Sequence, residues 1–179
     1  MKLRLLSENK SSVIDAVVKD ARVLVIALWV GACVLFAAVL APVLFEVLPT
    51  RELAGIVVNR VLRILNVSGL VAGAGLLLSL WRGGQHRSAI VWRIEAASLA
   101  IVVVTCAVNY FVIARRIAEL RARMPVPIDT LAADDAMRVA FGNLHGWSIL
   151  VLGCGVVAGL VALILIARRE ACDGGLIAR

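Results

Sequence analysis

The sequence predicts an all-α fold, namely an integral membrane four-helix bundle with an N-terminal interfacial amphipathic helix. Hydrophobic residues make up 62% of the 179-residue chain and charged residues 17%, whereas soluble domains have about 45–50% apolar and about 25% charged residues. The apolar residues are gathered in four long runs that approach the length needed to cross a bilayer. These observations exclude a soluble enzyme, a disordered chain and a disulfide-rich scaffold.

The N-terminal segment, residues 1–22, is expected to lie at the membrane surface. Residues 12–22 carry pairs of apolar side chains at helical spacing, a pattern typical of an interfacial helix. The first membrane span is expected at residues 23–45, which contain no charge. At about 1.5 Å per residue this run covers about 34 Å, enough for a hydrocarbon core about 30 Å thick.

The four-span membrane domain, residues 23–167, continues with three further spans. They are expected at residues 64–81, 96–114 and 147–167. Because a backbone in hydrocarbon must pair its own polar groups, each run should be a helix. Residues 168–179 are expected to form a C-terminal tail.

The connections between the spans have distinct signals. Pro49 is expected to end the first helix, within a connection at residues 46–63. Residues 82–95 form a short turn rich in Gly and Arg, whereas residues 115–146 begin as a helical extension and break at two prolines. The chain resumes as a helix after Asp134 and Asp135, which suit a helix start.

Four spans place both termini on the same side of the membrane. Of the 19 basic residues, 11 fall on that side and 8 on the other. This bias predicts that both termini face the cytoplasm. The net charge of +7 then reflects basic residues that flank the spans, and no domain-sized polar segment offers a face for nucleic acid.

Small residues mark helix faces that can approach closely in lipid. They are strongest in the pairs Gly69/Gly73 and Gly155/Gly159. Two interpretations are open, namely packing within one bundle and contact with a membrane-protein partner or a second copy of the chain. Three cysteines inside the runs, Cys33, Cys106 and Cys154, lack metal-ligand spacing, so we expect them to pack as small apolar residues and predict no metal site.

Polar side chains gather where the first and third spans end and where the second and fourth begin. An up-down bundle brings these ends to one membrane side, where charged groups are costly and are usually paired or functional. The candidate pocket residues are Glu46, Arg63, Asn66, Asn109, Tyr110, Arg116, Arg138, His145 and Ser148. Either the arginines snorkel to headgroups and Glu46 pairs with one of them, or the basic groups form a site for an anion or headgroup.

His145 is a candidate axial ligand for a single tetrapyrrole, because a histidine at the end of a span can bind its metal. No second histidine lies inside a span, and the spans contain no catalytic Ser/His/Asp arrangement or carboxylate pair. The sequence therefore requires no cofactor and favours a protein that is not an enzyme.

Several short motifs resemble a known family. They are Trp29-x-Gly31, Ala41-Pro42-Val43-Leu44-Phe45, Ala54-Gly55, Asn109-Tyr110, Arg116-Ile117, Leu120-Arg121 and Arg138-x-x-Phe141-x-x-Leu144-His145-Gly146-x-Ser148. Together they resemble a bacterial four-span family of unknown function in the copper resistance protein D-like superfamily, and are similar to a eukaryotic transmembrane family linked to platinum-drug resistance. The resemblance implies a four-helix bundle in a bacterial inner membrane in which Arg116, Arg138 and His145 matter, within a superfamily that handles copper or haem-type cofactors.

The leading functional hypothesis is a non-enzymatic membrane protein with a polar pocket around His145. The alternatives are an accessory subunit of a respiratory or photosynthetic complex, a transporter or a protein that handles haem or copper, and a cofactor enzyme of the haem-biosynthetic kind. In every case the lipid bilayer is the expected surroundings.

Overall fold

A computed structural model describes the backbone of residues 2–82, 88–124, 126 and 128–177, and the surroundings of side chains within residues 17–18, 20–81, 88–124, 126, 128 and 130–168. All regular structure in these residues is helical. Four helical segments are long and apolar enough to cross a membrane, namely Asp20–Val47, Arg51–Trp81, Ala89–Arg123 and Ala136–Arg168. The predicted all-α four-helix membrane architecture is confirmed.

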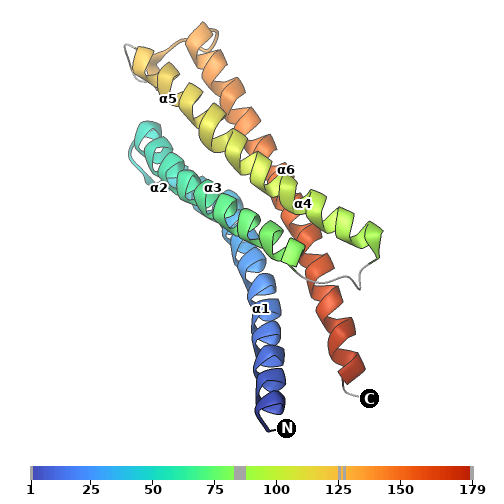
Figure 1. Ribbon diagram of the computed structural model, residues 1–179. Helices are drawn as coiled ribbons and strands as arrows, with labels where there is room; N and C mark the ends of the chain where they lie inside the picture. Colours follow the sequence, from blue (N-terminus) through green and yellow to red (C-terminus); the bar gives the residue numbers. More distant parts are fainter. Residues whose placement is uncertain (1, 83–87, 125, 127, 178–179) are drawn as a thin grey trace.

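The helices form two hairpins that cross one another (Figure 1). The first hairpin comprises α1 (Lys2–Leu35), the π-helical turn η1 (Phe36–Leu40), α2 (Ala41–Val47) and α3 (Arg51–Arg82). The second comprises α4 (Ala89–Ala107), the π-helical turn η2 (Val108–Ile113), α5 (Ala114–Arg123), the 3-10 turn η3 (Ile128–Thr130) and α6 (Ala136–Ile177). We call the end where α1 begins and α6 finishes the terminal end, and the opposite end the distal end (Figure 1).

The second helix begins earlier than the sequence predicts, whereas the helix expected after Asp134 and Asp135 does begin at Ala136 and continues without a break into the fourth span. The expected connection at residues 46–63 shrinks to residues 48–50. Capping side chains explain both starts. Thr50 Oγ1 accepts a hydrogen bond from the Leu53 amide at 3.2 Å, and Asp135 Oδ1 accepts one from the Met137 amide at 2.8 Å. An apolar run therefore marks the part of a helix that lies in hydrocarbon, but not where the helix starts.

The expected interfacial helix is helical, but it is not a separate element. Helix α1 runs without a break from Lys2 into the first span. The sequence explains this, because no Gly or Pro occurs between Lys2 and Val30 to interrupt the helix. At the other terminus, α6 continues to Ile177, so most of the expected tail extends the fourth helix.

Pro42 explains the π-helical turn in the first span. Proline has no N–H and its ring clashes with the carbonyl four residues earlier, so an α-helix cannot continue through it unchanged. Immediately before it, the Ala41 amide donates to the Phe36 carbonyl, five residues back. The wider turn accommodates the proline, and the helix resumes as α2 until Val47, just before Pro49.

Trp29 lies at the crossing of the two hairpins. Its indole N–H donates to the Leu65 carbonyl at 3.0 Å. A Cβ atom at Gly69 would lie 2.6 Å from Trp29 Nε1, and one at Gly159 would lie 3.1 Å from Trp29 Cζ3. A Cβ atom at Gly155 would similarly lie 2.7 Å from Thr105 Oγ1. The glycine faces are therefore occupied by helices of the same chain, which is the first of the two interpretations.

The cysteines divide into two groups. Cys33 and Cys106 are buried in the core beside Trp29, as expected for small apolar residues. Cys154 is exposed on α6, so the expectation that it packs as a small apolar residue against other parts of the chain is wrong. Among the residues with described side chains, no group of three His, Cys, Asp or Glu could hold a metal ion.

Candidate anion-binding cleft

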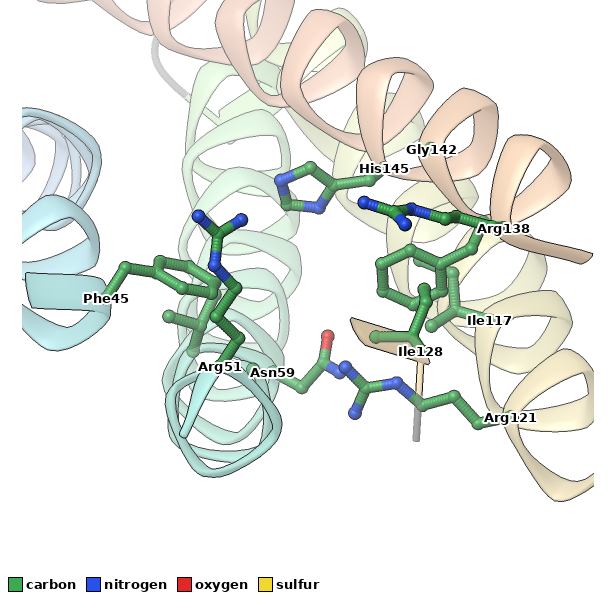
Figure 2. A pocket seen from close by; sticks show the side chains of 12 residues that line it. Phe45, Arg51, Asn59, Ile117, Arg121, Ile128, Arg138, Gly142 and His145 are labelled. Carbon is green, nitrogen blue, oxygen red and sulfur yellow. The ribbon is translucent and has the colours of Figure 1, made fainter. Parts of the chain in front are cut away.

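A cleft of about 460 Å³ lies between the two hairpins at the distal end. From the first hairpin it is lined by Phe45, Arg51, Gly55, Val58 and Asn59. From the second it is lined by Ile117, Arg121, Ile128, Arg138, Phe141, Gly142 and His145. Figure 2 shows these side chains approaching the same space from opposite sides. The cleft therefore depends on how far the hairpins diverge.

The polar lining of the cleft is basic. Arg51 comes from the first hairpin, and Arg121, Arg138 and His145 come from the second (Figure 2). None of the lining residues that the structure describes is acidic. Guanidinium groups bind carboxylate and phosphate through paired charge-assisted hydrogen bonds. The lining therefore favours a ligand whose negatively charged group can contact basic side chains of both hairpins.

Arg121 is held in place by both hairpins. Its guanidinium carbon lies 5.2 Å from the centroid of the Phe141 ring, a cation–π contact. On its other side it approaches Gly55 so closely that a Cβ atom there would lie 2.6 Å from Arg121 Nη2. The absence of a side chain at Gly55 lets the guanidinium lie against α3, so this position shapes the cleft.

Arg138, Phe141 and His145 form a stripe along α6. Arg138 and His145 are seven residues apart and therefore share a helix face. Arg138 Nη1 donates to the Leu131 carbonyl at 2.7 Å, and the rings of Phe141 and His145 are parallel, with centroids 6.4 Å apart. The loop contact fixes one end of the stripe and ring packing orders the other.

Apart from the Asn59 side chain, the remaining lining is apolar. Phe45, Ile128 and Phe141 contribute to it, together with the well-buried Val58 and Ile117. An apolar surface beside basic groups suits a ligand that carries both an anion and a hydrophobic part.

The predicted pocket residues do not form one site. Arg138 and His145 line the cleft. Two further pairs lie outside it: Arg63 Nη2 donates to Tyr110 Oη at 3.1 Å, and Asn109 exchanges hydrogen bonds with Ser148. The Ser148 hydroxyl donates to Asn109 Oδ1 at 2.8 Å.

Three other predicted residues have separate surroundings. Asn66 is buried and donates to the Leu62 carbonyl of its own helix at 2.9 Å. Glu46 and Arg116 are exposed and do not line the cleft.

The sequence prediction missed the first hairpin's half of the cleft. Arg51, Gly55 and Asn59 recur every four residues and so lie on one helix face. The sequence does not reveal this shared face, because residues 46–63 are predicted to be a connection instead of a helix. The predicted pocket also leaves out Arg121, although Leu120-Arg121 is one of the family motifs and Arg121 lies four residues after Ile117 on the same face of α5.

A second missed feature lies at the terminal end. Arg22 Nη2 of α1 and Glu95 Oε1 of α4 are 2.6 Å apart, and their side chains are 11% and 1% exposed. In the described part of the chain, Arg22 Nε is buried without a hydrogen-bond partner. This ion pair links the first hairpin to the second.

Comparison with sequence families decides the relationship. The family described as a domain of unknown function (DUF4149) matches residues 24–125. The chain belongs to this family. The match includes the motifs around Trp29, Pro42 and Arg121, and it ends before the Arg138–Ser148 motif. No curated protein and no solved structure matches the chain, so the links to copper resistance and to platinum-drug resistance stay predictions.

Proposed function

We propose that this DUF4149 protein binds an amphipathic anion in the distal cleft and does no chemistry on it. One observation carries the proposal: Arg51, Arg121 and Arg138 converge from two hairpins on a cavity whose described lining holds no carboxylate. Like charges that face one another across a cavity repel, and a bound anion relieves this repulsion. A ligand that carries negative charge should therefore bind in the cleft more strongly than a neutral ligand.

The position of the cleft relative to the membrane limits the class of ligand that it can bind. Its lining residues lie at or beyond the distal ends of the uncharged runs, from Phe45 in the first helix to His145 in the fourth. Such residues fall near the level of lipid headgroups. We therefore expect a carboxylate or phosphate attached to an apolar body. A tetrapyrrole with carboxylate groups belongs to this class, and His145 remains the candidate ligand for its metal.

Thermal unfolding of the purified protein in a neutral maltoside detergent tests the proposal. The probes are octyl phosphate, inorganic phosphate and uncharged octanol. A ligand that binds the folded state adds about 2.7 kcal/mol of stability at a concentration 100 times its Kd. Octyl phosphate should raise the unfolding temperature most, inorganic phosphate less, and octanol least. A Soret absorption band in the purified protein would identify a tetrapyrrole as the natural ligand.

The matched variants have equal changes in charge. Arg51→Gln/Arg138→Gln removes two cations from the cleft, whereas Arg115→Gln/Arg116→Gln removes two exposed cations from α5 outside it. The first pair should lose the stabilisation by octyl phosphate and the second should keep it. Equal stabilisation by octanol, or equal loss in both variants, would refute an anion site in the cleft.

We also propose that the termini face the cytoplasm of a bacterial cell, so that the cleft opens on the periplasmic side. The basic bias of the sequence supports this orientation. A periplasmic reporter enzyme fused after Arg179 should be inactive, and the same reporter inserted after Ala133 in the distal loop should be active. The reverse pattern would invert the orientation. Roles as a complex subunit or transporter stay hypotheses that gentle co-purification and uptake by proteoliposomes would test.

A further inference from the structure

A second hollow lies on the outside of the first hairpin, away from the cleft. This groove, with a volume of about 790 Å³, is lined by Val25 of α1 and by Arg60, Arg63, Ile64, Val67, Ser68, Val71 and Ala72 of α3. It shares no lining residue with the cleft. The two sites occupy different faces of α3, so a ligand in one does not require a ligand in the other.

Two arginines lie together at the distal end of the groove. Arg60 and Arg63 are three residues apart and therefore neighbours on one helix face. The Arg63 guanidinium donates to the Tyr110 hydroxyl at 3.1 Å, and its central carbon lies 5.4 Å from the centroid of the same ring. Tyr110 belongs to the second hairpin. Its two contacts restrict the Arg63 side chain to one position, whereas an arginine without such contacts would sample many rotamers.

The rest of the groove is apolar. Ile64, Val67 and Val71 are exposed along α3, and Ser68 satisfies its hydroxyl on the Leu65 carbonyl at 3.0 Å. With the Ser68 hydroxyl already hydrogen-bonded, this wall does not depend on water for hydrogen bonds and can contact a hydrocarbon chain.

The length of the groove matches one leaflet. From Arg60 to Ala72 the helix rises about 18 Å, at about 1.5 Å per residue. Half of a hydrocarbon core about 30 Å thick is about 15 Å. The uncharged run of the second span begins at Ile64, directly after the two arginines. The charged end of the groove is thus at the membrane edge and its apolar part within the distal leaflet.

We propose that the groove binds one anionic phospholipid of the distal leaflet. Arg60 and Arg63 hold the phosphate, and one acyl chain follows α3 past Val67 and Val71. None of the described lining residues is acidic, so a zwitterionic lipid finds no partner for its ammonium group here. A lipid with net negative charge is therefore preferred.

Native mass spectrometry tests this preference. The purified protein is mixed with equal amounts of phosphatidylglycerol and phosphatidylcholine that have the same acyl chains. The wild type should retain phosphatidylglycerol about tenfold over phosphatidylcholine, the order expected for two arginines at an anionic headgroup. Arg60→Gln/Arg63→Gln should abolish the preference, and Arg115→Gln/Arg116→Gln, with the same loss of charge, should keep it.

Two further variants separate the groove from the cleft and from general surface charge. Val67→Trp/Val71→Trp fills the apolar wall and should reduce retention of both lipids, which tests the site even if the arginine variant does not fold. Arg51→Gln/Arg138→Gln alters the cleft and should leave the lipid preference unchanged. A wild type without preference, equal loss in the Arg115/Arg116 control, or loss only in the cleft variant would overturn the groove site.

Discussion

The two ends of the bundle handle charge in opposite ways. At the terminal end, Arg22 and Glu95 face each other at 2.6 Å in a closely packed region beside Ile26. At the distal end, the arginines that line the cleft have no carboxylate among the described lining residues. A charge that is paired inside the protein ties two helices together, whereas one without an internal partner attracts a counter-charge from outside. A buried charge therefore does not by itself identify a binding site. What identifies one is whether the charge has its counter-charge inside the protein or must take it from a ligand.

The crossing at Trp29 separates these two ends. There the hairpins meet through glycines that allow side chains of the facing helices to approach closely. On the terminal side of the crossing the ion pair links the two hairpins, and on the distal side the cleft lies between them. The same two hairpins thus provide one end with an internal ion pair and one end with a basic cleft.

The largest expected effect is at the terminal end. Glu95→Ala leaves Arg22 buried without this counter-charge, which typically costs about 3–5 kcal/mol when one partner of a buried pair is removed. Thermal unfolding in neutral detergent measures the loss. Glu119→Ala, which removes an exposed carboxylate of α5, is the control and should change stability little. If Glu95→Ala lowers the stability no more than Glu119→Ala does, the ion pair does not hold the two hairpins together.

The crossing should be the next most sensitive region. At Gly69 a Cβ atom would lie 2.6 Å from Cys106 Sγ, while at Gly75 of the same helix nothing lies within 4 Å. Gly69→Val should therefore destabilise the protein by about 1–3 kcal/mol relative to Gly75→Val, the usual cost of an overpacked core. Both variants are compared by chemical or thermal unfolding, and equal stabilities would contradict the close helix contact.

A smaller, selective effect is expected at the cleft wall. Gly55→Val pushes against Arg121 Nη2, which is the far end of a flexible side chain and can move. Stability should stay near that of the wild type, but octyl phosphate should bind about tenfold more weakly, as for one lost charge-assisted hydrogen bond. Unchanged affinity together with a lower unfolding temperature would assign Gly55 to packing instead of ligand binding.

The smallest effect is expected at Arg116, although the family resemblance implies that this residue matters. It is exposed and outside the cleft. Arg116→Gln should change the free energy of unfolding by less than about 0.5 kcal/mol and leave octyl phosphate affinity unchanged. A clear loss of affinity would extend the binding site beyond the cleft and along α5.

The sequence predicts the four spans well because hydrocarbon requires long uncharged runs. It also predicts that Arg138 and His145 share a face, because seven residues make nearly two helical turns. It fails at Arg51 and Asn59, since a helix can start well before its apolar part. Arg22 and Glu95 are 73 residues apart, and their pairing depends on which helices become neighbours, which spacing along one helix does not specify.

Calorimetric titration of octyl phosphate tests the contrast between the two ends most directly. The wild type, Arg51→Gln/Arg138→Gln and Arg115→Gln/Arg116→Gln are titrated in the same neutral detergent. We expect the wild type and the α5 variant to have the same Kd, and the cleft variant to bind at least about tenfold more weakly, a difference of about 1.4 kcal/mol. The same Kd in all three proteins would show that octyl phosphate does not bind to the arginines of the cleft, and would contradict the proposed contrast between the two ends.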